Sequence, residues 1–169
     1  MKCLIVGRTQ EAVAECIKYG LKSHNPAPST LEYDYTQPFG GDVISCHTIK
    51  PWSDYACTVE TSKRVEDSAM AHPAKVMVGN SVLHPISADS PLNEFALIFK
   101  QRNPTMNSGV FAMCWAFTQG YDEIYTVGID LVWDRELLAY VNNMFKKYPN
   151  QKVYKVSKTS WLPCEVKEP

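Results

Sequence analysis

The stretch that decides the fold is Asn107–Asp130, with the sequence NSGVFAMCWAFTQGYDEIYTVGID. Its first part, Val110–Gln119, is apolar on all sides of a helix, which is typical of a helix buried in a core. Gly120 follows at the position where helices commonly end, and Glu123–Val127 then has the pattern of a strand, closed by Gly-Ile-Asp. The stretch therefore predicts a buried helix that leads directly into a strand.

Predicted strands and helices alternate along the rest of the chain. Lys2–Val6 predicts a strand, which Gly7 separates from a helix over Gln10–Tyr19. The other predicted elements are strands at Thr30–Tyr35, Asp42–His47, Tyr55–Val59, Lys75–Val78 and Lys152–Val156, and helices at Thr61–Met70 and Arg135–Lys147. This alternation predicts an α/β fold, a mostly parallel twisted sheet flanked by helices in a Rossmann-like three-layer arrangement.

Four segments lack such a pattern. Leu21–Ser29 and Ser81–Pro91 are rich in proline and polar residues and are predicted loops, and the tail from Trp161 is predicted to be irregular. Leu92–Lys100 is apolar, and its pattern fits a helix as well as a strand.

The composition sets limits on the kind of protein. A chain of 169 residues, 45% hydrophobic and 21% charged, is expected to form one domain over residues 1–169. The net charge of −1 and the scattered basic residues argue against a nucleic-acid partner or an anionic membrane. The apolar run at Leu4–Val6 is too short for a signal peptide or a membrane span, so a cytoplasmic location is expected.

The six cysteines carry no Cys-x-x-Cys pair and no cysteine–histidine cluster at zinc spacing. Cys3, Cys46, Cys57 and Cys114 lie inside apolar segments, where a free thiol behaves as a small hydrophobe. Reduced thiols are therefore expected in place of disulfides, and no metal site is expected.

Three places could hold a ligand beyond the carboxyl ends of the strands. Gly7, Arg8 and Thr9 follow the first strand and could meet a phosphate, but an ordinary turn explains them equally well. A second group begins the central helix and a third ends the following strand: Asn107, Ser108 and Gly109, then Gly128 and Asp130. The helix start could bind a phosphate or carboxylate or be a simple cap, and Asp130 could bind ribose, hold a metal or cap a turn.

His47 ends a predicted buried strand at the same edge of the sheet. By position it is the best available general base, but a single histidine is more often a structural group. No Ser/His/Asp order and no paired-carboxylate spacing supports another catalytic assignment.

The block Asn107–Asp130 resembles the Thr-Ser-Gly-Val, Ala-x-x-x-Gly-Tyr-x-x-Ile-Tyr and Gly-Ile-Asp signature of bacterial sialyltransferases of glycosyltransferase family 42. The related domain-of-unknown-function 115 proteins carry similar blocks. Asp42–His47 resembles the family's Asp-Val-Phe-Arg-Cys-Asn strand, and Met1–Gly7 and Lys146–Val156 resemble its first and last core strands. The resemblance implies a nucleotide-binding Rossmann-like core that transfers sialic acid from CMP-sialic acid without a metal or other cofactor.

The resemblance also implies roles for the candidate residues. Asn107, Ser108 and Gly109 would face the donor's phosphate or sugar carboxylate, Gly128 and Asp130 would line the nucleoside, and Gly7 and Arg8 would lie close to it. His47 takes the place of an asparagine that contacts the nucleotide in the family, and either side chain can form hydrogen bonds.

The chain departs from the family at several positions. Arg8-Thr9-Gln10-Glu11 stands where the family has Asn-Gly-Pro-Ser, and Val132 stands in place of a tyrosine. Asp130 runs almost directly into the helix near Arg135, so the family's lid and the histidine base that it carries have no counterpart. Three hypotheses stay open: a glycosyltransferase that uses a nucleotide sugar, a non-catalytic nucleotide-binding or sequestering module, and a scaffold for interactions. The oligomeric state is also left open, a homo-oligomer included.

Overall fold

The computed structural model describes residues 1–7, 21–23, 33–35, 39–59, 62–79, 108–129, 135–156 and 162–169. For 21–23 and 33–35 it describes the backbone only. The helix predicted at Gln10–Tyr19 and the ambiguous segment Leu92–Lys100 lie outside these residues.

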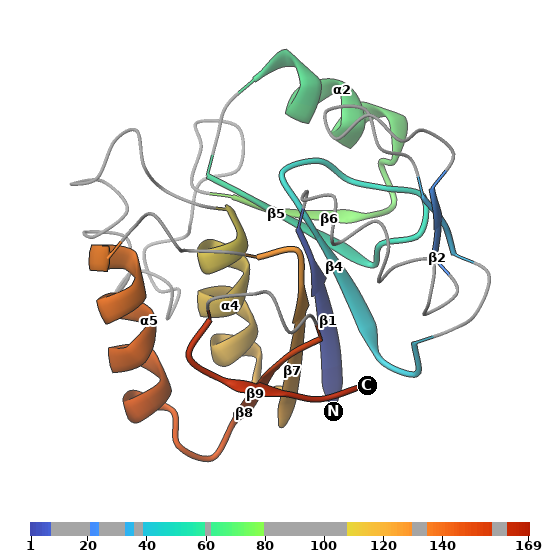
Figure 1. Ribbon diagram of the computed structural model, residues 1–169. Coiled ribbons are helices and arrows are strands. Elements are labelled where there is room, and N and C mark those ends of the chain that lie inside the picture. Colours follow the sequence, from blue (N-terminus) through green and yellow to red (C-terminus); the bar gives the residue numbers. More distant parts are fainter. Residues whose placement is uncertain are drawn as a thin grey trace.

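A seven-stranded parallel sheet forms the centre of the molecule (Figure 1). Its strands lie in the order β6-β5-β4-β1-β7-β8-β9, and every neighbouring pair is parallel. Their bounds are β1 Lys2–Val6, β4 Asp42–Cys46, β5 Tyr55–Thr58, β6 Val76–Gly79, β7 Glu123–Val127, β8 Lys152–Lys155 and β9 Glu165–Val166. The predicted α/β, Rossmann-like fold is confirmed.

Helix α4, Ser108–Gln119, is buried along almost its whole length, as its sequence predicts. It packs against β1, β4 and β5, and α5 (Arg135–Lys147) lies beside it on the same face (Figure 1). Gly120 ends α4 with a φ of +76°, and its N–H donates to the carbonyl of Phe117. A glycine adopts this left-handed conformation without the cost that a side chain would add.

The central strands bury both of their faces. Alternate residues of β1 and β4 point toward α4: Cys3, Ile5, Ile44 and Cys46. The other residues of these strands, Leu4, Val6 and Val43, belong to a second core cluster on the opposite face. The rest of that cluster is Trp52, Tyr125, Val127 and Val156. Helix α2, Lys63–Ala71, joins β5 to β6, and the right-handed rule for such crossovers puts it on this second face.

Two short strands contradict the sequence predictions. Leu21–Ser23 (β2), at the start of a predicted loop, pairs antiparallel with Tyr33–Tyr35 (β3). Glu165–Val166 (β9) lies in the tail predicted to be irregular, and it pairs with β8. Strands of three and two residues are too short to show alternation, and they form because another strand offers its hydrogen bonds.

The order of the strands creates a switch point at the centre of the sheet. From β1 the chain proceeds to β4, β5 and β6 on one side, and it then returns to place β7 on the other side of β1. Ligands of open α/β sheets bind where the strand order reverses in this way, outside the carboxyl ends of the strands. None of the helices among the described residues is both long and apolar enough to span a membrane.

Candidate functional site

Gly7 and Gly128 meet at the switch point, where β1 and β7 end. The N–H of Gly7 donates to the carbonyl of Val127 over 2.7 Å. A Cβ atom on Gly7 would lie 2.1 Å from the carbonyl oxygen of Gly128, which no side chain tolerates. Gly128 itself has a φ of +70°. Gly7 is therefore required by the close approach of two chain segments and Gly128 by its left-handed backbone conformation, whether or not a ligand binds beside them.

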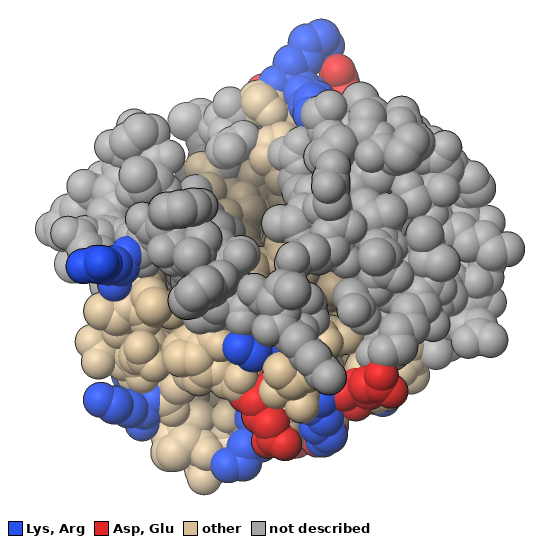
Figure 2. Space-filling view, viewed as in Figure 1, with Lys and Arg blue, Asp and Glu red and all other residues tan. Residues whose placement is uncertain are grey.

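The N-terminal end of α4 lies at the same edge of the sheet. Because α4 ends only a few residues before β7 begins, the helix runs antiparallel to the strands, and its first residues, Ser108 and Gly109, lie at their carboxyl ends (Figure 1). Among the described residues that the space-filling view shows at this edge, the atoms near the beginning of α4 are uncharged (Figure 2). The first N–H groups of a helix have no partner within it, and the helix dipole there favours an anion.

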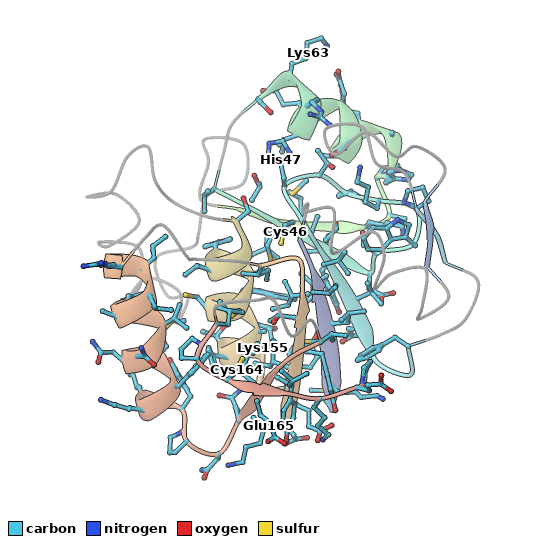
Figure 3. The ribbon with its side chains drawn as sticks, viewed as in Figure 1. Cys46, His47, Lys63, Lys155, Cys164 and Glu165 are labelled. Carbon is cyan, nitrogen blue, oxygen red and sulfur yellow. The ribbon has the colours of Figure 1, made fainter. Side chains whose placement is uncertain are left out.

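His47 follows β4 at this edge (Figure 3). Its backbone conformation is unusual. Its φ is +78°, and the N–H of Thr48 donates to the carbonyl of Cys46 over 3.1 Å. A hydrogen bond between residues two apart, with a positive φ at the central residue, defines a rare and strained form of γ-turn. The N–H of His47 also continues the ladder, because it donates to the carbonyl of Cys57 over 2.7 Å.

His47 is buried, with 6% of its surface exposed. A buried non-glycine residue with positive φ costs of the order of 1–3 kcal/mol, and such residues gather at functional sites. Among the predicted site residues, His47 is thus the one whose local structure is hardest to explain by folding alone.

The structure brings part of the predicted site together. Gly7 and Gly128 are in contact, and His47, Ser108 and Gly109 lie at the same carboxyl edge of the sheet. The other predicted site residues, Arg8, Thr9, Asn107 and Asp130, lie outside the described residues.

The buried thiols do not provide a nucleophile. Burial raises the pKa of Cys3 and of Cys57, and the carboxylate of Asp42 adds to the effect at Cys3. Such thiols stay protonated and pack as small hydrophobes, as their apolar neighbours in the sequence predict. In the part of the chain that the structure describes, no group of three or more histidine, cysteine or acidic residues could hold a metal ion.

Sequence reasoning missed the polar residues that support the His47 turn. Ser45 and Ser53 are both buried, and the ammonium group of Lys75 reaches the turn Lys50–Ser53. Pro51 signals a turn at this point of the sequence, but no local pattern indicates that Lys75, more than twenty residues along the chain, contacts it.

A parallel sheet with a central switch point, flanked by helices, defines a Rossmann-like α/β protein. No family model matches the sequence, and no curated protein matches it significantly. Solved structures are similar to it: one is the sialyltransferase CstII from Campylobacter jejuni with the substrate analogue CMP-3FNeuAc, at a TM-score of 0.57 and 16% identity over 98% of this chain and 84% of that chain. Another is the same sialyltransferase with cytidine-5'-monophosphate, at a TM-score of 0.51 and 17% identity over 95% of this chain and 81% of that chain. At this identity the likeness shows a shared fold.

Proposed function

We propose that this chain is a sialyltransferase-like protein, one nucleotide-binding domain over residues 1–169, that binds a nucleotide sugar of the CMP-sialic acid type and transfers its sugar. The observation that carries the proposal is the switch point between β1 and β7, with the beginning of α4 at the same edge. The similar structures support it because they hold a sialyltransferase in complex with the substrate analogue CMP-3FNeuAc and with cytidine-5'-monophosphate.

In this proposal the helix start binds the anionic part of the donor. Asn107, Ser108 and Gly109 present N–H and hydroxyl donors to the phosphate, which becomes the leaving group when the bond to the sugar breaks. Electrostatic stabilisation of that leaving phosphate is then the largest contribution to the rate.

The remaining candidates surround the nucleoside and the reacting hydroxyl. Gly128 and Asp130 line the nucleoside, with Gly7, Arg8 and Thr9 close to it. His47 accepts the proton of the acceptor hydroxyl as that oxygen attacks the sugar.

A second function is favoured by the spacing after β7. Only residues 131–134 separate Asp130 from Arg135, the first residue of α5, which leaves no length for a lid between them. A site without a lid exposes the donor to water, which suits a module that binds or sequesters a nucleotide without turnover.

Ser108→Asp tests the location of the site. A carboxylate in the first turn stabilises a helix, so α4 is expected to keep or gain stability, but the same charge repels a bound phosphate. We expect CMP to raise the melting temperature of the wild type and to have no effect on the Ser108→Asp variant. Ser62→Asp introduces the same charge at the N-cap of α2 and is the matched control, expected to respond to CMP as the wild type does.

The screen includes CMP, CMP-sialic acid and other nucleotides and nucleotide sugars. If none of them shifts the melting temperature of the wild type, both nucleotide-binding functions are refuted and the scaffold hypothesis stands. A shift without release of CMP from CMP-sialic acid, with or without an acceptor sugar, favours the sequestering module. If Ser108→Asp binds CMP as the wild type does, the site lies elsewhere.

A further inference from the structure

The segment that follows His47 is held by an unusually complete set of hydrogen bonds. The hydroxyl of Ser45 lies 2.8 Å from the carbonyl oxygen of Thr48 and 3.1 Å from the hydroxyl of Ser53. The N–H of Ile49 donates to the hydroxyl of Ser68 in α2 over 3.2 Å. Ser45 and Ser53 are almost fully buried, so these bonds form out of contact with water.

The far end of the segment is a β-turn over Lys50–Ser53. The N–H of Ser53 donates to the carbonyl of Lys50 over 3.1 Å, and the N–H of Lys50 donates to the hydroxyl of Ser53 over 3.1 Å. Trp52 packs from this turn into the core cluster that contains Leu4 and Val43. The side chain of Asp54 then accepts from the N–H of Val43 over 2.8 Å, which fixes the turn against β4.

The side chain of Lys75 contacts the β-turn Lys50–Ser53. Its ammonium group lies within 3.1 Å of three carbonyl oxygens, those of Lys50, Pro51 and Ser53. Three carbonyl oxygens that converge on one point repel one another unless a cation lies between them. The partial burial of Lys75 lowers the pKa of its amine, and Asp54 opposes this effect.

A continuous path leads from Lys75 to the strained turn. The ammonium group contacts the carbonyl of Ser53, the hydroxyl of Ser53 contacts that of Ser45, and the hydroxyl of Ser45 contacts the carbonyl of Thr48. Thr48 is the residue whose N–H closes the γ-turn around His47. A strained conformation persists only where the surrounding structure determines it several times over, and this segment meets that condition.

We propose that Lys75 is a positioning residue for His47: its ammonium group holds the segment Thr48–Asp54 in the form that keeps the His47 turn strained and its imidazole at the carboxyl edge of the sheet. The inference rests on the proposed function in one respect: that function is what gives His47 a catalytic role. The mechanical part, from Lys75 to the turn, stands on the hydrogen bonds alone.

The test replaces Lys75 by Met, which keeps the length of the side chain and removes the charge. The matched control is Lys63→Met, because Lys63 is exposed and bonds only to Asp67 among the contacts that the structure gives it. Lys75→Arg retains a cation with several donors and is expected to restore the wild-type behaviour.

The first measurement needs no ligand. In NMR spectra, Lys75→Met is expected to move the imidazole resonances of His47 and to change the φ-sensitive couplings at its backbone, and Lys63→Met is expected to leave both unchanged. The second measurement is donor turnover: Lys75→Met is expected to lower kcat by about tenfold to hundredfold with KM unchanged, as small displacements of a catalytic group do.

The outcomes separate the inference from the proposed function. Unmoved His47 resonances in a folded Lys75→Met variant refute the inference, whatever the enzyme assay shows. Resonances that move while the wild type releases no CMP from CMP-sialic acid confirm the mechanical role and refute the catalytic one. If Lys75→Met does not fold, Ser53→Ala is used in its place, because it removes the hydroxyl that links Lys75 to Ser45. Unmoved His47 resonances in Ser53→Ala then refute the inference.

Discussion

Replacing His47 by Gly and, separately, by Ala measures the strain in the turn that ends β4. Both variants lose the same imidazole. In the wild type His47 is buried, with 6% of its surface exposed. The variants differ in one respect: at a φ of +78° an alanine still pays the steric cost of a Cβ atom, and a glycine does not.

The size of the difference follows from two opposing contributions. A positive φ costs a non-glycine residue roughly 1–2 kcal/mol. Glycine loses more backbone entropy than alanine on folding, and this destabilises the glycine variant by about 0.5–1 kcal/mol relative to the alanine variant. We therefore expect His47→Gly to be more stable than His47→Ala by roughly 0.5–1 kcal/mol, or about 1–4 °C in melting temperature for a chain of this size.

Urea unfolding of the two variants at the same pH gives the stability difference, and CMP release from CMP-sialic acid gives the activity. Both variants are expected to lose turnover equally, since neither has an imidazole. His47→Asn serves as the control, because asparagine tolerates positive φ better than most residues and retains a hydrogen-bonding group. Equal stability of the Gly and Ala variants would refute the strained turn, and wild-type turnover in either would refute His47 as the base.

Three further predictions concern the rest of the described structure. Gly7→Ala is expected to lower the unfolding free energy by about 2 kcal/mol or more in urea, because the new Cβ atom would overlap the carbonyl of Gly128; an unchanged midpoint would contradict this packing. The ion pair with Lys167 holds the pKa of Glu123 below its usual range, so Glu123→Gln should be less stable than the wild type at pH 7, with the difference shrinking as the pH falls below about 4; a difference independent of pH would argue against the pair. Burial raises the pKa of Cys164 to about 11, so mass spectrometry should find it alkylated far more slowly at pH 8 in the native protein than in urea.

The longest elements could be predicted because their signals are local. The strand Glu123–Val127 and the helix Arg135–Lys147 have the bounds that their sequences predict, and α4 begins two residues earlier than its apolar run at Val110. In each, apolar periodicity and a stop residue such as Gly120 lie within the element itself. The mostly parallel sheet was predicted from the alternation of such elements, but the order of its strands was not.

The features that were missed have no signal within their own stretch of sequence. Strands β2 and β9 form only because β3 and β8 lie beside them. The positive φ of His47 has no sequence signal, since no glycine marks the position. Lys75 contacts the turn Lys50–Ser53, and nothing in the sequence of the turn indicates that contact.

The described site residues differ in how much they say about function. Gly7 and Gly128 have a complete structural explanation: a Cβ atom on Gly7 would overlap the carbonyl of Gly128, and Gly128 has a φ of +70°, a conformation that favours glycine. A ligand is therefore not needed to account for them. Ser108 likewise lies in the first turn of α4, where serine is common in any protein.

His47 has no such explanation. Glycine would form the same γ-turn at lower cost, yet the chain places a bulky imidazole there and holds it with buried serines and the ammonium group of Lys75. Structure that opposes local stability in this way is expected where a side chain must occupy one position for chemistry or binding. The case for a functional site at this edge of the sheet therefore depends on His47 and its support more than on the glycines that first indicated it.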